Sequence, residues 1–107
     1  MCRLRHAELL DAAHIVPDSA EAGEPRVSNG LALCKLHHAA FDSFLLSVTP
    51  DYRIEVRPSV LEEEDGPVLE HGLKRLHRTA IQLPRRPSER PDRECLALHF
   101  EKFRHAA

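Results

Sequence analysis

The first half of the chain alternates short apolar runs with polar intervals, which predicts a strand, a loop, a second strand and a helix. Residues 9–16 form an apolar stretch that ends at Pro17, and this predicts a short strand because proline cannot continue a hydrogen-bonded ladder. Residues 17–30 are rich in turn-forming residues and predict a loop. Residues 30–34 predict a second short strand, and residues 35–44 carry apolar side chains at helical spacing.

The apolar runs of the middle of the chain are shorter. Residues 45–49 and 52–57 flank Pro50 and Asp51, an arrangement that is typical of a β-hairpin. An acidic stretch at 62–67 then interrupts the pattern. Residues 79–83 predict a further strand.

The last part of the chain begins with a connector at 84–91 that is rich in proline and arginine. A helix is expected to begin within residues 91–94, because proline is favoured in a first helical turn. Leu96, Phe100 and Phe103 would then lie on one face of that helix. Strands and helices of this kind predict a small α+β fold.

The composition fits one globular domain. The chain has 107 residues, of which 42% are apolar and 30% are charged, and this length leaves no room for two domains. No apolar run approaches the roughly 18–20 residues of a membrane span, and no hydrophobic stretch of a signal peptide follows the first residues. Three scattered cysteines are too few for a disulfide framework, so a cytoplasmic location is expected.

The net charge of −2 hides an uneven distribution. Residues 1–45 carry four basic and six acidic side chains, and residues 46–71 carry two and seven. Residues 72–107 carry nine basic and four acidic side chains, so the end of the chain is basic. Such an end can present a local positive face, although a solvated surface would give the same pattern.

Eight histidines are an unusual number for this length, and two of them stand in a pattern with other polar residues. His14 ends the first predicted strand, Asn29 precedes the second, and His38 lies on the predicted helix. Asp42 follows His38 by four residues, so both side chains share one helix face about one turn apart. A histidine nitrogen and a carboxylate oxygen at this spacing suit a divalent ion such as Mg²⁺ or Mn²⁺, or a borderline ion.

At these positions the chain resembles the HNH endonucleases, which have the ββα-metal fold, and in particular their restriction-endonuclease-like branch. The resemblance rests on the segments AAHIVP at 12–17, SNGLALC at 28–34 and LHHAAFD at 36–42. It implies a ββα-metal core at about 8–45, followed by a hairpin and a carboxyl-terminal helix within about 46–107.

The resemblance also implies the function and the roles of residues. The reaction would be metal-dependent hydrolysis of phosphodiester bonds in DNA, as in restriction-type HNH enzymes. His14 would be the general base, and Asn29 would hold the two strands and the loop in register. His38 and Asp42 would bind the catalytic metal, Mg²⁺ or Mn²⁺, with Ni²⁺ or Zn²⁺ as alternatives. Arginines near the basic end would contact DNA phosphates, namely Arg85, Arg86, Arg90 and Arg93.

The chain departs from the family pattern in one place next to the general base. Many HNH nucleases have a metal ligand immediately before that histidine, and here the position is Ala13. Asp11 lies two residues earlier and therefore on the same face of a strand, so it is an alternative ligand.

The second departure concerns zinc. Many family members carry a structural Zn²⁺ site built from two knuckles, and here Cys2, Cys34 and His37 supply three ligands, one fewer than a closed tetrahedral site needs. The missing cysteine would precede Met1, so we expect a chain truncated at its amino terminus.

Two other interpretations of the function fit the same sequence pattern. A degenerate HNH or zinc-knuckle module that binds nucleic acid without cutting it, or the detached nuclease piece of a larger protein, would carry the same pattern. DNA is the expected partner, with a homodimer and a missing DNA-reading domain as further expectations and no membrane. Cys95 is expected to serve packing, and the remaining histidines are treated as surface or tuning residues: His6, His71, His77, His99 and His105.

Overall fold

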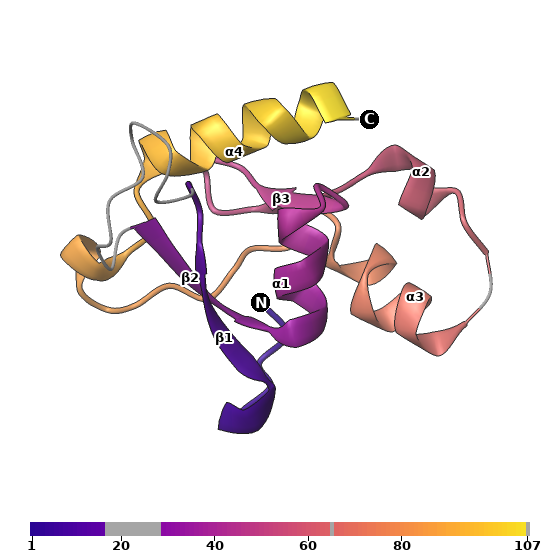
Figure 1. The fold of residues 1–107 in the computed structure, drawn as a ribbon, viewed down its shortest axis with the longest axis horizontal. Helices are drawn as coiled ribbons and strands as arrows, with labels where there is room; N and C mark the ends of the chain where they lie inside the picture. The colour runs from indigo at the N-terminus through magenta and orange to yellow at the C-terminus, as the bar shows by residue number, and fades with distance from the viewer. Residues whose placement is uncertain (17–28, 65, 107) are drawn as a thin grey trace.

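Two short antiparallel strand pairs and four α-helices make up the fold in the computed structural model, which describes residues 1–16, 29–64 and 66–106 (Figure 1). The strands are β1 (Leu10–His14), β2 (Gly30–Cys34), β3 (Leu46–Val48) and β4 (Ile54–Val56). The α-helices are α1 (Lys35–Asp42), α2 (Pro58–Leu61), α3 (Pro67–Gly72) and α4 (Arg93–Ala106). Single 3₁₀ turns lie at Ala7–Leu9, Lys74–Leu76 and Pro87–Glu89.

The ribbon of β1 and β2 leads directly into α1, which confirms the predicted order of strand, strand and helix and gives an α+β fold with a ββα core. In this ribbon Leu10 pairs with Cys34 and His14 pairs with Gly30. The loop expected at 17–30 falls mainly on residues 17–28, which lie outside the described residues. Because successive side chains of a strand point to opposite faces, Asp11 and His14 lie on different faces of β1.

The helix α1 begins directly where β2 ends, and the side chain of one residue caps the helix at this junction. Cys34 is the last residue of β2 and the N-cap of α1, where its Sγ accepts a hydrogen bond from the backbone N–H of His37. His37, Ala40 and Phe41 are buried at the three- and four-residue spacing of one helix face. This face turns the helix toward the core and leaves His38 half-buried beside it.

The predicted hairpin is confirmed as β3 and β4, which pair from Leu46 with Val56 to Val48 with Ile54. Its turn places Tyr52 in the left-handed region at a φ of 64°, which is unusual for a residue with a side chain. Tyr52 then donates its hydroxyl hydrogen bond to the carbonyl of Pro91 at 3.0 Å. The tip of the hairpin is thereby tied to the segment that precedes α4.

One prediction for the middle of the chain is wrong, and two short helices were missed. The strand expected at 79–83 is a single bridge between Ala80 and Arg53, because Ile81 adds one further backbone bond to Tyr52 and the segment then leaves the hairpin. The helices α2 and α3 were not predicted. Both are short and begin with a proline in the first turn, so they show little helical periodicity in the sequence.

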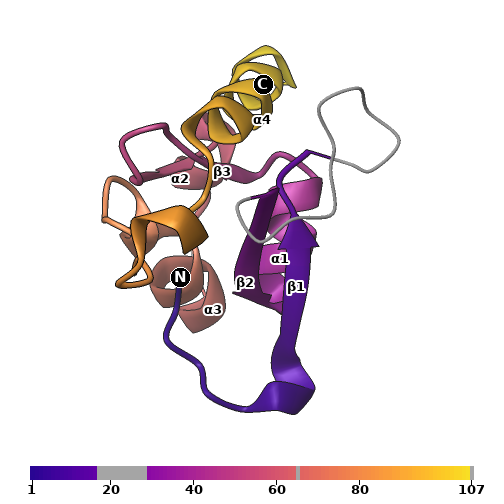
Figure 2. The same ribbon diagram turned by 90° about the vertical axis from the view of Figure 1, so that its left-hand side faces the viewer.

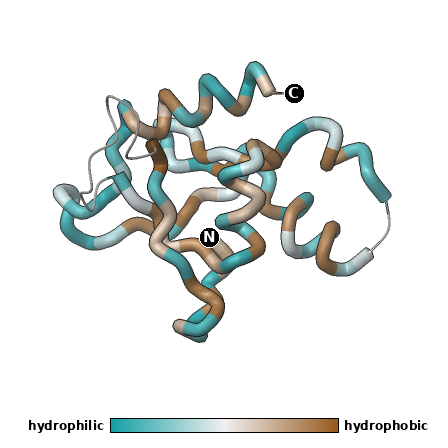
Figure 3. The backbone as a smooth tube through the Cα atoms, in the orientation of Figure 1, coloured by the Kyte–Doolittle hydropathy of each residue, from teal (hydrophilic) through white to brown (hydrophobic). Residues whose placement is uncertain are grey.

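The predicted carboxyl-terminal helix is confirmed as α4. The Asp92 side chain accepts a hydrogen bond from the backbone N–H of Glu94 at 2.7 Å. Such a contact is typical of an N-cap residue. Figure 3 shows apolar and polar positions alternating along α4. The helix buries Cys95, Leu96, His99 and Phe103 on the face turned to β3. None of the described helices is long and apolar enough to cross a lipid bilayer.

The treatment of His99 as a surface or tuning residue is wrong, because this side chain is buried against α1 and β3. Its ring stacks on that of Phe41 with 3.6 Å between ring centroids, and Phe44 tilts against it. Nε2 donates to the carbonyl of Phe41 at 3.0 Å, and Nδ1 accepts from the hydroxyl of Ser47 at 2.6 Å. Burial, with a smaller contribution from Lys102, lowers the pKa of His99 to about 4.

We expect this histidine to make the fold sensitive to acid. A histidine in the unfolded chain titrates near 6.5, whereas His99 titrates near 4 in the folded protein, so the unfolded state binds more protons between these values. The contribution of His99 to stability should be complete above pH 6.5 and fall by up to about 3 kcal/mol as the pH is lowered toward 4. Urea denaturation at a series of pH values measures this loss.

The control is His99→Gln, which replaces the imidazole with a polar amide that does not titrate. This variant should be less stable at neutral pH but lose less stability than the wild type between pH 6.5 and 4. An equal loss of stability in both proteins over that range would show that His99 is not the group responsible.

Candidate functional site

Asn29 joins the two strands of the ribbon just beyond their last paired residues. Its side chain is fully buried, and its Oδ1 accepts from the backbone N–H of Val16 at 2.9 Å. Its Nδ2 donates to the carbonyl of the same residue, also at 2.9 Å. The backbone N–H of Ile15 donates to the Asn29 carbonyl at 3.0 Å. One asparagine therefore satisfies both backbone polar groups of Val16 where the strands diverge.

His14, the last residue of β1, is exposed and lines an open cavity of about 670 Å³. One wall of the cavity is the β1–β2 ribbon, and the other walls are Met1, Ala7 and residues between Ile81 and Pro91. Figure 2 shows the amino-terminal end and the segment that precedes α4 lying across from the ribbon. Asp11 lines the same cavity.

His38 lies between two carboxylates that come from different elements. Its Nδ1 donates to Oδ2 of Asp11 on β1 at 2.9 Å, and its Nε2 lies 3.1 Å from Oδ2 of Asp42 on α1. The side chains of His38 and Asp11 are 28% and 30% exposed, whereas that of Asp42 is 58% exposed. The structure thus brings together Asp11, His38 and Asp42 at the edge between β1 and α1.

Asp11 has a second cationic neighbour. Lys35, the first residue of α1, donates from Nζ to the other carboxylate oxygen of Asp11 at 2.9 Å. The hydrogen bonds from His38 and then from Lys35 lower the pKa of the Asp11 carboxyl. Sequence reasoning missed Lys35, and its position 24 residues from Asp11 gave no signal of the contact.

The spacing between His38 and Asp42 fits two ligands of one ion. Adjacent ligands of an octahedral ion with bonds of about 2.1 Å lie roughly 3.0 Å apart. The 3.1 Å between Nε2 and Oδ2 matches that value, and a nitrogen with a carboxylate oxygen suits Mg²⁺, Mn²⁺ or a borderline ion. Ala13 is buried on the α1 side of β1 and offers no ligand atom.

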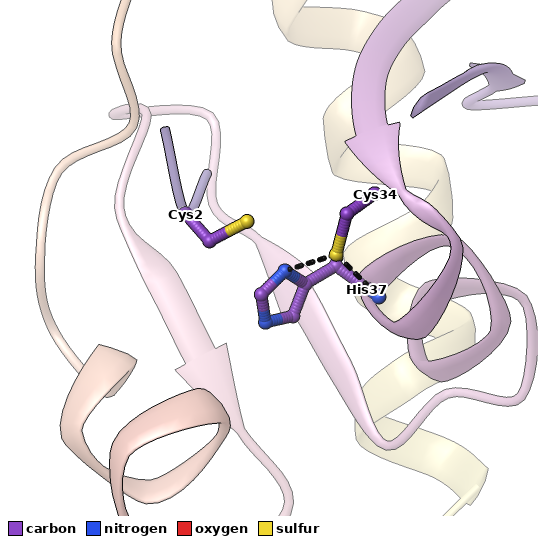
Figure 4. Close-up of side chains that lie close together, drawn as sticks. All are labelled: Cys2, Cys34 and His37. Carbon is purple, nitrogen blue, oxygen red and sulfur yellow. Dashed lines mark hydrogen bonds between the residues drawn. The ribbon is translucent and has the colours of Figure 1, made fainter. Parts of the chain in front are cut away.

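A second group of metal-ligating atoms lies at the amino-terminal end of α1. Cys2, Cys34 and His37 each offer one atom, and the three atoms lie within 4.8 Å of one another. Figure 4 shows the three side chains pointing toward one another, with Cys2 reaching in from the amino-terminal segment. This group can bind one metal ion.

The orientation of His37 suits a metal ligand. Its Nδ1 lies 3.1 Å from Cys34 Sγ, and its Nε2 donates to the carbonyl of Gly72 in α3 at 2.6 Å. A metal-bound histidine commonly donates its other N–H to a carbonyl or a carboxylate, which fixes the ring. Two sulfurs and one nitrogen are ligands that zinc prefers, and they leave the fourth position of a tetrahedral ion to another ligand. Gly72 was also missed by sequence reasoning.

The four arginines singled out in the sequence lie on the connector and at the start of α4. Arg85 and Arg86 are exposed, and Arg86 lies 3.8 Å from Glu89. Arg90 donates to the carbonyl of Pro84, whereas Arg93 stacks over the ring of Tyr52 at 5.0 Å. Because Pro84, Glu89 and Pro91 line the cavity, these arginines come from the segment that borders it.

The chain was compared with models of known protein families. Residues 1–49 match a family model described as HNH endonuclease. The match supports the HNH endonuclease family for this part of the chain. Searches of curated proteins and of solved structures gave no significant match. The matched residues include the β1–β2 ribbon and α1, so the HNH region contains Asn29, both metal-ligating groups and His14. The same match supports nuclease-type action on nucleic acid.

The buried asparagine of the HNH region gives a test of the ribbon. Asn29→Ala should lower the free energy of unfolding by about 2–4 kcal/mol, because it leaves the N–H and the carbonyl of Val16 buried without partners. Urea denaturation measures the change, and Gln82→Ala, which removes an exposed amide, should change it by less than about 0.5 kcal/mol. An equally small change for Asn29→Ala would contradict this role.

Proposed function

We propose that this HNH protein is a metal-dependent endonuclease that hydrolyses phosphodiester bonds in DNA, in the manner of restriction-type enzymes. The observation that carries the proposal is the position of Asp11. It contacts His38 and also lines the cavity that His14 lines, so one residue connects the proposed metal ligand His38 with the cavity that the proposed base lines. The HNH match supports a nucleic-acid substrate.

His14 is the general base in this proposal. Its imidazole is exposed at the cavity wall, and a neutral imidazole can accept a proton from an attacking water. Its place at the end of β1, where Asn29 fixes the backbone of the next two residues, holds it at the cavity wall. Asn29 is thus a positioning residue.

His38 and Asp42 hold the divalent ion, Mg²⁺ or Mn²⁺, with Ni²⁺ or Zn²⁺ as alternatives. Such an ion supplies electrostatic stabilisation of the charge that develops on the phosphate and on the leaving oxygen. Both side chains sit on one face of α1 and are partly open to solvent, so a phosphate group can approach them.

Basic residues of the connector complete the proposed DNA surface. The four arginines that contact phosphates in this proposal are Arg85, Arg86, Arg90 and Arg93, of which Arg85, Arg86 and Arg93 are exposed and Arg90 is half-buried. Such contacts are independent of sequence. Double-strand cutting with one site per chain favours a homodimer, and DNA reading would come from a further domain. A cytoplasmic location belongs to the same proposal.

The second metal group has a structural role in this proposal. Zn²⁺ bound by Cys2, Cys34 and His37 would join the amino-terminal segment to the start of α1 and, through the carbonyl of Gly72, to α3. It would thereby fix the end of the helix that carries the catalytic ligands.

Removing the proposed base tests the nuclease. His14→Ala should reduce plasmid nicking with Mg²⁺ or Mn²⁺ by about 10²–10⁴-fold, the usual contribution of a general base, while the circular dichroism spectrum stays that of the wild type. His71→Ala, which removes an exposed histidine of α3, should nick at the wild-type rate. Wild-type protein that binds DNA but never nicks it with any divalent ion would favour the degenerate, non-catalytic module.

The zinc group is tested by the metal content of the purified protein. Wild-type protein should contain about one zinc per chain, and Cys34→Ser and His37→Ala should each lose most of it, because a site with two protein ligands binds weakly. Cys95→Ala, which changes a buried cysteine of α4, should keep the metal. Folded wild-type protein that contains no metal by elemental analysis would contradict the zinc site.

A further inference from the structure

The two carboxylates beside His38 contact different nitrogens of its ring. Asp11 meets Nδ1 from β1, and Asp42 lies beside Nε2 on α1. The two ring nitrogens point in different directions, so Asp11 and Asp42 lie on different sides of the ring. This arrangement suggests different tasks for the two acidic residues.

We propose that Asp11 is a positioning residue that holds the ring of His38 with its Nδ1 proton toward β1 and its Nε2 toward Asp42, where that nitrogen is available to a metal ion. The inference rests on the proposed function, since it takes His38 and Asp42 as the ligands of the nuclease metal. A carboxylate that accepts the second N–H of a metal-binding histidine fixes its tautomer and its orientation and makes it a better ligand.

Lys35 fixes the carboxylate in turn. Its ammonium donates to Oδ1 of Asp11, which leaves Oδ2 for the N–H of His38. Hydrogen bonds between charged groups are shorter and stronger than those between neutral groups, so this pair restrains the plane of the carboxylate. Lys35, Asp11, His38 and Asp42 thus form one chain of contacts from the start of α1, across β1 and back to the end of the helix.

The position of Asp11 on β1 explains how a strand residue can contact a side chain of α1. Asp11 shares a face with Ala13, and the small side chain of Ala13 is buried on that face. The register that pairs Asp11 with Leu33 places Asp11 beside the first turn of α1, which follows β2 without a loop. The same register holds His14 on the opposite face.

The experiment measures the tautomer of His38 and the affinity for Mn²⁺ in the full chain. Nitrogen-15 NMR of the imidazole rings, without added Mg²⁺ or Mn²⁺, should show His38 with its proton on Nδ1 in the wild type. Asp11→Ala should lose this preference and bind Mn²⁺ about 10–100-fold more weakly by titration calorimetry. Asp11→Asn keeps an oxygen that accepts the N–H, so it should keep the tautomer and lose less affinity.

The control is Glu8→Ala, which removes an exposed carboxylate from the same segment without touching His38. It should change neither the tautomer nor the affinity. The inference is overturned if Asp11→Ala keeps the wild-type tautomer, or if its affinity for Mn²⁺ changes as little as that of Glu8→Ala. Equal loss of Mn²⁺ binding in Asp11→Asn and Asp11→Ala, with the tautomer unchanged in both, would make Asp11 a direct ligand and would also overturn it.

Failure of this inference is distinguishable from failure of the nuclease. His14→Ala should abolish nicking but leave the His38 tautomer and the Mn²⁺ affinity as in the wild type. A wild-type protein that nicks no DNA, yet whose Mn²⁺ affinity and His38 tautomer depend on Asp11 as described, supports the positioning role and contradicts the nuclease alone.

Discussion

The buried side chain of Asn29 is the constraint on which the candidate site depends. A ribbon of two strands is marginally stable by itself, and β1 and β2 have no third strand in the described part of the chain. Slipping one strand by a single residue would exchange the two faces of the ribbon and move Asp11 away from α1. The two hydrogen bonds of Asn29 with Val16 fix the register at the end where His14 lies. The chemistry of both faces therefore depends on one amide.

The helix α1 then distributes two consecutive histidines to two different environments. Successive residues of a helix are about 100° apart around its axis, so His37 and His38 cannot share a direction. His37 is buried beside Cys34, whereas His38 is half-buried beside Asp11. Cys34 caps the helix with the same sulfur that belongs to the metal-ligating group. Binding of an ion at this end would therefore also fix the direction of the helix axis, and with it the position of His38, the next residue of the helix.

The elements with strong local signals were the ones that could be predicted from the sequence. The proline that follows β1, the apolar spacing of α1 and the capping pattern of α4 are local, and the elements they indicated are present. The strand expected at 79–83 failed because an apolar run states only that a segment is half-buried, not that a partner strand continues beside it. The burial of His99 was missed because its neighbours lie more than 50 residues away, in Phe41 and Ser47.

The same limit applies to the site. The spacing of His38 and Asp42 on a helix made their contact predictable, since four residues are one turn. The contacts of Lys35 with Asp11 and of His37 with Gly72 join segments 24 and 35 residues apart, and no spacing rule covers such distances. Sequence patterns could therefore name the candidate metal-ligating groups better than the groups that hold them in place.

The residues beyond the HNH match contribute to the site rather than only surrounding it. The match ends at residue 49, yet the carbonyl that orients His37 belongs to Gly72, and the wall opposite His14 is formed by residues between Ile81 and Pro91. His99, further along, stacks on Phe41 and so packs α4 against the helix that carries His38. Because a packed interior transmits small displacements, these three segments are placed to influence the orientation of the candidate ligands in the HNH region. The ββα core thus packs against the part of the chain that the family model does not match.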